Sequence, residues 1–205
     1  MITVHHLRDS RSHRILWLLE ELGLPYEVDA YDRDANGRAP AALRALNPLG
    51  RAPVITDGDR RLKESGAVVD YLIRRHGGGR LQPDPSTPAY DDYVHWLHYA
   101  EGSAMLPFEF YLRFERLGAA AAPMMAEVER EIDNHLRYID GALRGRIYLL
   151  GDELTGADIV LMDIGKLARQ AGKIDAFPAI AAWYDRLQNR PAFIAALKRG
   201  GVNPA

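Results

Sequence analysis

The sequence contains no cysteine among its 205 residues. The chain therefore forms no disulfide, binds no metal through a thiolate and has no cysteine nucleophile. Any thiol chemistry that this protein performs must use a thiol supplied by another molecule.

Long apolar runs and a dominant charge are also lacking. No run approaches the roughly 20 apolar residues that span a bilayer, and the N-terminus has no charged and then apolar signal segment. The formal net charge is -2, from 26 basic and 28 acidic residues. A mixed surface of this kind gives no electrostatic reason to expect nucleic acid or an anionic membrane as a partner. We expect a globular, cytoplasmic protein with neither partner.

The motifs of several enzyme classes are missing. The chain has no phosphate-binding glycine loop and no nucleophile elbow. His95, His98 and Glu101 recur at three-residue spacing, but no further ligand completes a metal site beside them. We therefore expect no metal cofactor, and a surface or packing role for these three side chains.

The first 80 residues alternate between strand and helix patterns. Residues 2–7 predict a strand, Arg11 to Leu22 a helix with a broad apolar face, and residues 26–32 a second strand. This order places two parallel strands in one sheet, because the helix crosses over between them. The remaining expected elements are a short helix at 41–46, a hairpin of strands 53–56 and 60–62, and a helix at 64–76.

The spacing of the apolar residues changes partway along the chain. Three prolines between Arg80 and Pro88 indicate a linker. Beyond it the apolar residues recur at helical spacing, and further helices begin near Thr155, Pro178 and Pro191. We expect an α/β domain of residues 1–80 followed by an all-helical domain of residues 89–205.

Five segments occur in an order and spacing that are typical of one family: "DSRSHRILWLLEELGLPYE", "YDRDANGRAPAALRALNPLGRAPVI", "LKESGAVVDYL", "YAEGSAML" and "LTGADIVLMD". In these segments, which cover nearly the whole chain, the protein resembles the cytosolic glutathione transferases. It is most similar to the fungal and bacterial branch with a serine after the first strand. The resemblance implies a thioredoxin-like N-terminal domain that binds glutathione, a helical C-terminal domain that supplies most of the second-substrate pocket, and a homodimer.

The resemblance points to Ser10 as the hydroxyl that donates a hydrogen bond to the glutathione thiolate, with Ser12 as the second choice. A free thiol has a pKa of roughly 8.5, so lowering it by about two units requires roughly 2.7 kcal/mol of preferential thiolate stabilisation. A hydroxyl donor and a helix N-terminus together supply this. The alternative is that either serine only caps the helix. Arg14 either helps to position an anionic ligand or is solvated.

The other ends of glutathione have candidate partners. In the family, the residue before a cis-proline holds the cysteinyl backbone, and that pair here is Ala52-Pro53. Glu64-Ser65 matches the pair that binds the γ-glutamyl end, with a plain helix cap as the alternative. Two arginines are candidates for the glycyl carboxylate: Arg51 and, more weakly, Arg38.

The segment "TGAD" predicts architecture and not chemistry. Thr155 and Asp158 have the spacing of a capping box that begins a buried helix. We therefore expect that removing the Asp158 carboxylate lowers the melting temperature and spares glutathione binding.

The second substrate is expected near residues 99–114, where aromatic and apolar side chains gather and Gly102 and Pro107 permit a kink. Side chains at this spacing are also typical of a core. The function predicted is a transferase that conjugates glutathione to small, mostly apolar electrophiles in detoxification, with peroxidase or isomerase activity as variants of the same thiolate chemistry. The alternative is a non-catalytic relative that binds ligands or proteins. The missing cysteine argues against the disulfide-exchange branches.

Overall fold

The computed structural model describes residues 1–201, which form two compact units. The first unit is Met1–Gln82 together with the segment that begins at Gln188, and the second is Pro83–Leu187. The last helix, α9 (Pro191–Arg199), thus belongs to the first unit, although its sequence position follows the helical domain. The functional division into residues 1–80 and 89–205 stays a prediction.

Aromatic and charged contacts explain the place of α9. Phe193 packs edge-on against Trp17 of α1 (His13–Leu22), with ring centroids 5.3 Å apart. The Arg199 guanidinium lies over the Tyr26 ring, and Arg190 forms a bidentate ion pair with Glu21. Helical periodicity does not reveal such partners, because it defines an apolar face and not what covers that face.

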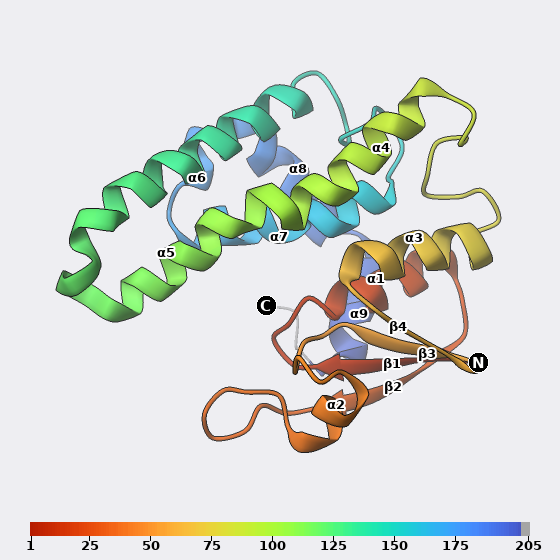
Figure 1. The fold of residues 1–205 in the computed structure, drawn as a ribbon. Coiled ribbons are helices and arrows are strands. Elements are labelled where there is room, and N and C mark those ends of the chain that lie inside the picture. Colours follow the sequence, from red (N-terminus) through yellow and green to blue (C-terminus); the bar gives the residue numbers. More distant parts are fainter. Residues whose placement is uncertain (202–205) are drawn as a thin grey trace. The chain divides into compact units, whose positions relative to one another are not determined.

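A four-stranded mixed sheet organises the first unit (Figure 1). Its strand order is β2-β1-β3-β4. As predicted, β1 and β2 are parallel and β3 and β4 form an antiparallel hairpin. The structure adds that β3 also pairs antiparallel with β1. The strands are β1 (Ile2–Leu7), β2 (Tyr26–Tyr31), β3 (Val54–Asp57) and β4 (Arg60–Lys63).

Helices cover both faces of this sheet. Figure 1 shows α1 and α3 (Ser65–His76) on one face and the short α2 (Ala41–Leu46) on the other. Leu43 of α2 packs with Leu7 and Val54 in an apolar cluster. Side chains alternate along a strand, so neighbouring residues of β1 point to opposite faces. His6 accordingly contacts Ser12 at the start of α1, whereas His5 contacts Tyr31.

The second unit contains only helical elements among its described residues. A π-helical turn (Ala100–Ala104) lies between α4 and α5, where the sequence predicted a kink. Pro107 contributes to this widening, because it has no N–H for the carbonyl four residues earlier. No helix within residues 1–201 is both long and apolar enough to cross a membrane. The α-helices are α4 (Pro88–Tyr99), α5 (Met105–Leu117), α6 (Ala122–Leu143), α7 (Gly156–Gln170) and α8 (Pro178–Gln188).

A buried carboxylate fixes the start of α7. Asp158 is fully buried and completes the capping box that the sequence predicted. One oxygen, Oδ2, accepts the backbone N–H and the hydroxyl of Thr155, both at 3.0 Å. The other, Oδ1, accepts the Leu149 N–H and the Trp183 indole N–H, both at 2.9 Å. Burial raises the pKa of Asp158, and these four donors oppose that effect. The carboxylate therefore joins three segments of the unit.

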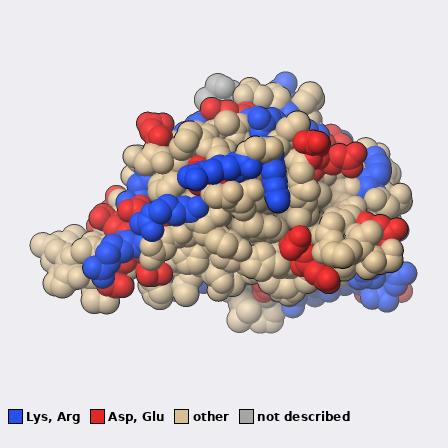
Figure 2. Space-filling view, turned by 90° about the horizontal axis from the view of Figure 1, so that it is seen from above, with Lys and Arg blue, Asp and Glu red and all other residues tan. Residues whose placement is uncertain are grey.

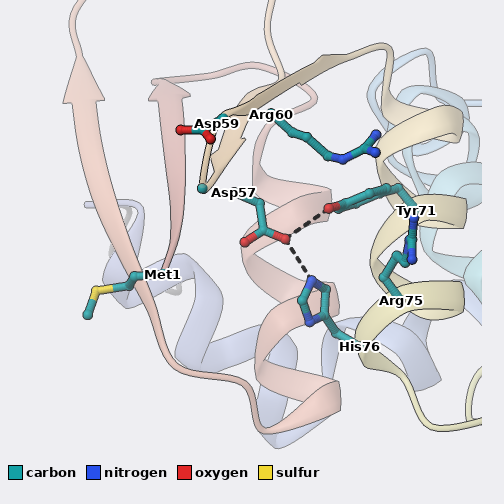
Figure 3. A pocket seen from close by; sticks show the side chains of 8 residues that line it. Met1, Asp57, Asp59, Arg60, Tyr71, Arg75 and His76 are labelled. Atoms are coloured by element: carbon teal, nitrogen blue, oxygen red, sulfur yellow. Dashed lines mark hydrogen bonds and ion pairs between the residues drawn. The ribbon is translucent and has the colours of Figure 1, made fainter.

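Another carboxylate ties the β3–β4 hairpin to α3 (Figure 3). Asp57 accepts hydrogen bonds from His76 at 2.7 Å and from the Tyr71 hydroxyl at 3.0 Å. These three side chains line a surface pocket of about 570 Å³, together with Arg60 and Arg75. Burial acts to raise the pKa of Asp57, but the bonds from His76 and Tyr71 outweigh it and lower the pKa. The contacts hold the C-terminal half of α3 against the hairpin.

We expect Asp57→Asn to lower the melting temperature by a few degrees at pH 7. A carboxyl group with a depressed pKa in the folded state stabilises the fold above its unfolded pKa of about 4, and this contribution disappears as the pH falls further. The difference between parent and variant should therefore narrow below about pH 4. Thermal unfolding of both proteins from pH 3 to 7 measures this difference in melting temperature. Asp59→Asn at the same exposed turn is the control, and a pH-independent difference would contradict the assignment.

Candidate functional site

The loop between β1 and α1 presents two serine hydroxyls side by side. The Ser10 hydroxyl donates to the Leu7 carbonyl at 2.6 Å and lies 2.8 Å from Ser12 Oγ. Ser10 is half-buried, whereas Ser12 is 0% exposed. Because a bound ligand reaches only an accessible atom directly, Ser10 is the better placed of the two.

Ser12 does not cap α1, so the capping alternative is wrong for Ser12, whereas Ser10 Oγ accepts the Ser12 backbone N–H at 3.3 Å directly before the helix. Ser12 occupies the N-cap position in a helical conformation and makes no side-chain cap bond. The N–H groups of the first turn instead bond to the backbone carbonyls of Ser10, Arg11 and Ser12. The sequence predicted that this helix begins at Arg11. Because residues 10–12 form tight turns, α1 begins at His13 instead. The Ser12 hydroxyl is therefore not used as a cap, and both hydroxyls have hydrogen-bond partners within the loop and β1.

The loop before β3 carries an exposed backbone segment. The Ala52-Pro53 bond is cis, as the family resemblance implied. Within residues 1–201, the backbone of Ala52 has no hydrogen bond to another residue. The Asn47 amide donates to the Arg51 carbonyl at 2.9 Å and so fixes the preceding residue. Ala52 can accordingly offer its backbone to an extended peptide.

Glu64 and Ser65 lie where α3 begins. Glu64 has a φ of 69°, a left-handed conformation that is unusual for a residue other than glycine. No side chain caps α3, and Ser65 is its first helical residue. The plain-cap alternative for Ser65 is therefore wrong. The first N–H groups of α3 have no partner within the helix, which makes its N-terminus favourable for a carboxylate.

Arg14 joins this helix start to α1. Its side chain is 0% exposed, and Nη1 donates to the Ser65 hydroxyl at 3.1 Å. The solvated alternative for Arg14 is therefore wrong. A signal was present in the sequence, because Arg14 lies four residues before Leu18 on the apolar face of the helix. The buried cation connects Ser65 to the helix that follows the two serines.

The two candidate arginines for a glycyl carboxylate are exposed. Arg51 immediately precedes Ala52, so the structure keeps it beside the cis-proline segment. Arg38 lies in the loop after β2, where its backbone N–H donates to the Asp34 carboxylate. That bond, ahead of the one from Asn36, lowers the pKa of Asp34. No described contact brings Arg38 to the other candidate residues.

The helix expected to contact the second substrate is mixed in exposure. Met105 and Phe108 are buried in the second unit, as the core alternative predicted. Phe110 is exposed and stacks on Phe114, with ring centroids 5.9 Å apart. The Tyr99 hydroxyl is 2.6 Å from His135. These contacts leave Phe110 and Leu106 as exposed apolar groups of this segment that a ligand can reach.

Two expectations from the sequence concern the surface: that His95 has a surface or packing role and binds no metal, and that acidic and basic side chains are mixed. His95 lies 3.1 Å from the Tyr138 hydroxyl. No cluster of potential metal ligands occurs among the residues that the structure describes. Figure 2 shows acidic and basic side chains interspersed on one face, with uncharged residues covering most of it.

Together, a mixed four-stranded sheet, a cis-proline before β3 and a helical second unit define the class of two-domain proteins with a thioredoxin-like N-terminal domain. Profiles described as the glutathione S-transferase N-terminal domain and C-terminal domain match residues 1–74 and 99–191. The chain belongs to the glutathione S-transferase family. The predicted family, fold class and enzyme class are thereby confirmed.

Individual relatives agree with this assignment. Glutathione S-transferase 3 of Schizosaccharomyces pombe is 32% identical over 93% of this chain and 78% of its own. The crystal structure of a glutathione S-transferase from Actinobacillus pleuropneumoniae has a TM-score of 0.90 and 32% identity, and the match covers 99% of this chain and 94% of that one. A family member from Pseudomonas fluorescens with two glutathione molecules bound has a TM-score of 0.84 and 26% identity, over 96% and 92% of the chains.

Proposed function

We propose that this glutathione transferase binds glutathione on its first unit, with the thiolate at Ser10, for attack on small, mostly apolar electrophiles. The observation that carries the proposal is the position of the Ser10 hydroxyl. It lies half-buried before α1, the helix whose Arg14 reaches Ser65 at the start of α3. The hydroxyl and the start of α3 therefore belong to one connected framework.

The three parts of glutathione match three groups of this unit. The free backbone of Ala52 suits strand-like hydrogen bonds to the cysteinyl residue. Ser65 and the N–H groups of the first turn of α3 suit the γ-glutamyl carboxylate, with Glu64 beside them. Arg51 suits the glycyl carboxylate because it is exposed and adjoins Ala52. Arg38 is the weaker candidate for that role.

Ser10 acts as a hydrogen-bond donor and not as a base. The thiol proton leaves to water, and the Ser10 hydroxyl and the dipole of α1 stabilise the anion that remains. The sulfur electron pair then forms a bond to the electrophilic carbon, and the leaving group departs with its bonding pair or the unsaturated acceptor takes up a proton. With a hydroperoxide, the same thiolate attacks the terminal oxygen and releases the alcohol, or water from hydrogen peroxide, which leaves glutathione sulfenic acid. A second glutathione then displaces water and forms glutathione disulfide.

Ultraviolet absorbance of the bound thiolate against pH tests this function. We expect glutathione bound to the parent protein to titrate about two units below the roughly 8.5 of a free thiol. Conjugation of an aromatic electrophile should follow the same pKa. Binding without a lowered thiol pKa, or no binding, would instead favour the non-catalytic relative. Exclusive turnover of small polar electrophiles would contradict the apolar substrate class.

We expect Ser65→Ala to weaken glutathione binding about tenfold, because hydrogen bonds to charged groups contribute roughly 1.5–3 kcal/mol. Arg14 donates to Ser65 Oγ, so the serine hydrogen is directed elsewhere and suits a ligand carboxylate. Calorimetric titration measures the loss.

The matched ligand is cysteinylglycine, which lacks the γ-glutamyl end. Its affinity should be the same for the parent and the Ser65→Ala protein, and the thiol pKa should not change. An equal loss for both ligands would contradict the assignment of Ser65.

We propose that the protein is a cytoplasmic homodimer that takes part in detoxification. Exposed large apolar side chains support an assembly, because burying them in an interface removes them from water. Leu49 of the first unit is 76% exposed, and Leu106, Leu117 and Met124 are exposed in the second. Sedimentation equilibrium measures the mass, and a monomer would overturn the dimer.

A further inference from the structure

A row of hydrogen-bonding side chains runs from the candidate thiolate donor into the protein interior. Ser10 Oγ lies 2.8 Å from Ser12 Oγ, which lies 2.8 Å from His6 Nδ1. The Leu7 carbonyl is within reach of both hydroxyls, at 2.6 Å from Ser10 and 3.2 Å from Ser12. His6 is only 1% exposed, so the row ends in the interior.

The number of hydrogens in this row is limited. Each serine has one hydroxyl hydrogen. When Ser10 turns its hydrogen to a thiolate, the Leu7 carbonyl loses its 2.6 Å donor, and only Ser12 remains beside it among these hydroxyls. Ser12 can replace that donor, or donate to Ser10, only if its own hydrogen is not committed to His6. His6 Nδ1 must then be the donor to Ser12.

The surroundings of His6 fit this protonation state. Burial, and then the nearby His13, lower the pKa of His6 to about 4, so the imidazole is neutral and carries one N–H at neutral pH. Its Nε2 lies against the backbone of Gly200, whose influence acts to raise the pKa, but the two make no hydrogen bond of acceptable geometry. A buried N–H without an acceptor is costly. The hydrogen is therefore better placed on Nδ1, which has Ser12 Oγ at 2.8 Å.

We propose that His6 is a positioning residue for the thiolate: its Nδ1–H donates to Ser12 and thereby frees the Ser10 hydroxyl to donate to glutathione. The proposal rests on the proposed function, because it requires the thiolate at Ser10. Hydrogen bonds aligned in one direction also polarise each other, which strengthens the final bond to the anion. His6 itself touches neither glutathione nor the electrophile in this scheme.

The test compares two substitutions of His6 with one of its neighbour. His6→Phe keeps an aromatic ring but removes both nitrogens, whereas His6→Asn places an amide donor near the position of Nδ1. His5→Phe is the control, because His5 is buried on the same strand and faces the opposite side of the sheet. The readouts are the pKa of the bound glutathione thiol and kcat/KM for conjugation against pH.

We expect His6→Phe to raise the thiol pKa by about one unit, so that kcat/KM falls about tenfold below the pKa and recovers at high pH. His6→Asn should restore the thiol pKa to within about 0.3 unit of the parent value, and His5→Phe should not change it. A purely structural loss would reduce kcat/KM equally at all pH values. An unchanged thiol pKa in His6→Phe overturns the proposal.

Nitrogen chemical shifts of His6 in the parent protein provide a test without substitution. A protonated Nδ1 in the glutathione complex supports the proposal, and a protonated Nε2 overturns it. The proposed function fails separately, because it requires a lowered thiol pKa in the parent protein. If the parent lowers the pKa and His6→Phe leaves it lowered, only the role of His6 is wrong.

Discussion

Asp158→Ala is expected to lower the melting temperature by about 10 °C, a much larger effect than a single exposed helix cap provides. The substitution leaves four buried donors without their acceptor: the Thr155 N–H and hydroxyl, the Leu149 N–H and the Trp183 indole. An unsatisfied buried polar group costs about 1–3 kcal/mol. Because the four losses are not additive, we expect about 3–5 kcal/mol in total.

Two further variants separate the capping network from a general loss of charge. Asp158→Asn retains an oxygen for Leu149 and Trp183 but not an acceptor for the Thr155 N–H, so its melting temperature should be intermediate. Asp152→Ala removes an exposed carboxylate from the same segment and should have little effect. Differential scanning calorimetry measures all three. Equal melting of the Asp158→Ala and Asp152→Ala proteins would contradict the role of the network.

Glutathione binding should survive where Asp158→Ala remains folded. The candidate binding groups Ser10, Ala52 and Ser65 belong to the first unit, whereas Asp158 belongs to the second. A calorimetric titration below the melting transition measures the affinity. A large loss of affinity in the folded variant would show that the network also serves the binding site.

Local patterns predicted most elements of the first unit because each element has its own residue pattern or turn signal. A short strand pattern predicts β1, alternating residues predict β2, and the Asp57-Gly58-Asp59 turn predicts the hairpin. The place of α9 was not predictable, because the contact of Phe193 with Trp17 joins residues far apart in the chain. A helical period identifies a buried face and leaves its partner open.

The candidate site was predictable as a set of residues and not as a network. The resemblance supplied Ser10, Ala52-Pro53 and Glu64-Ser65, and it assigned no role to His6. The contact between Arg14 and Ser65 spans 51 positions and requires the packing of two helices. The local signal for this contact was an arginine on the apolar face of a predicted helix. Only the structure identifies Ser65 as the partner of that arginine.

Ser10→Ala is expected to raise the pKa of bound glutathione by about 1–2 units and to lower kcat/KM at pH 6.5 by about 10–100-fold. The physical reason is the loss of the accessible donor, which leaves only the dipole of α1 and the remaining polar groups to stabilise the thiolate. The rate loss should shrink above the raised pKa, because both proteins then hold the same ionised nucleophile. Thiolate absorbance and the pH profile of conjugation measure the two effects.

Ser12→Ala and Ser65→Ala distinguish the donor from its supports. Ser12 is buried behind Ser10, so its removal should raise the thiol pKa less than Ser10→Ala does and should also lower the melting temperature. Ser65→Ala should weaken binding without moving the thiol pKa, because Ser65 serves the opposite end of the tripeptide. If Ser12→Ala raises the thiol pKa more than Ser10→Ala, then Ser12 is the donor, and the loop must open for glutathione to reach it.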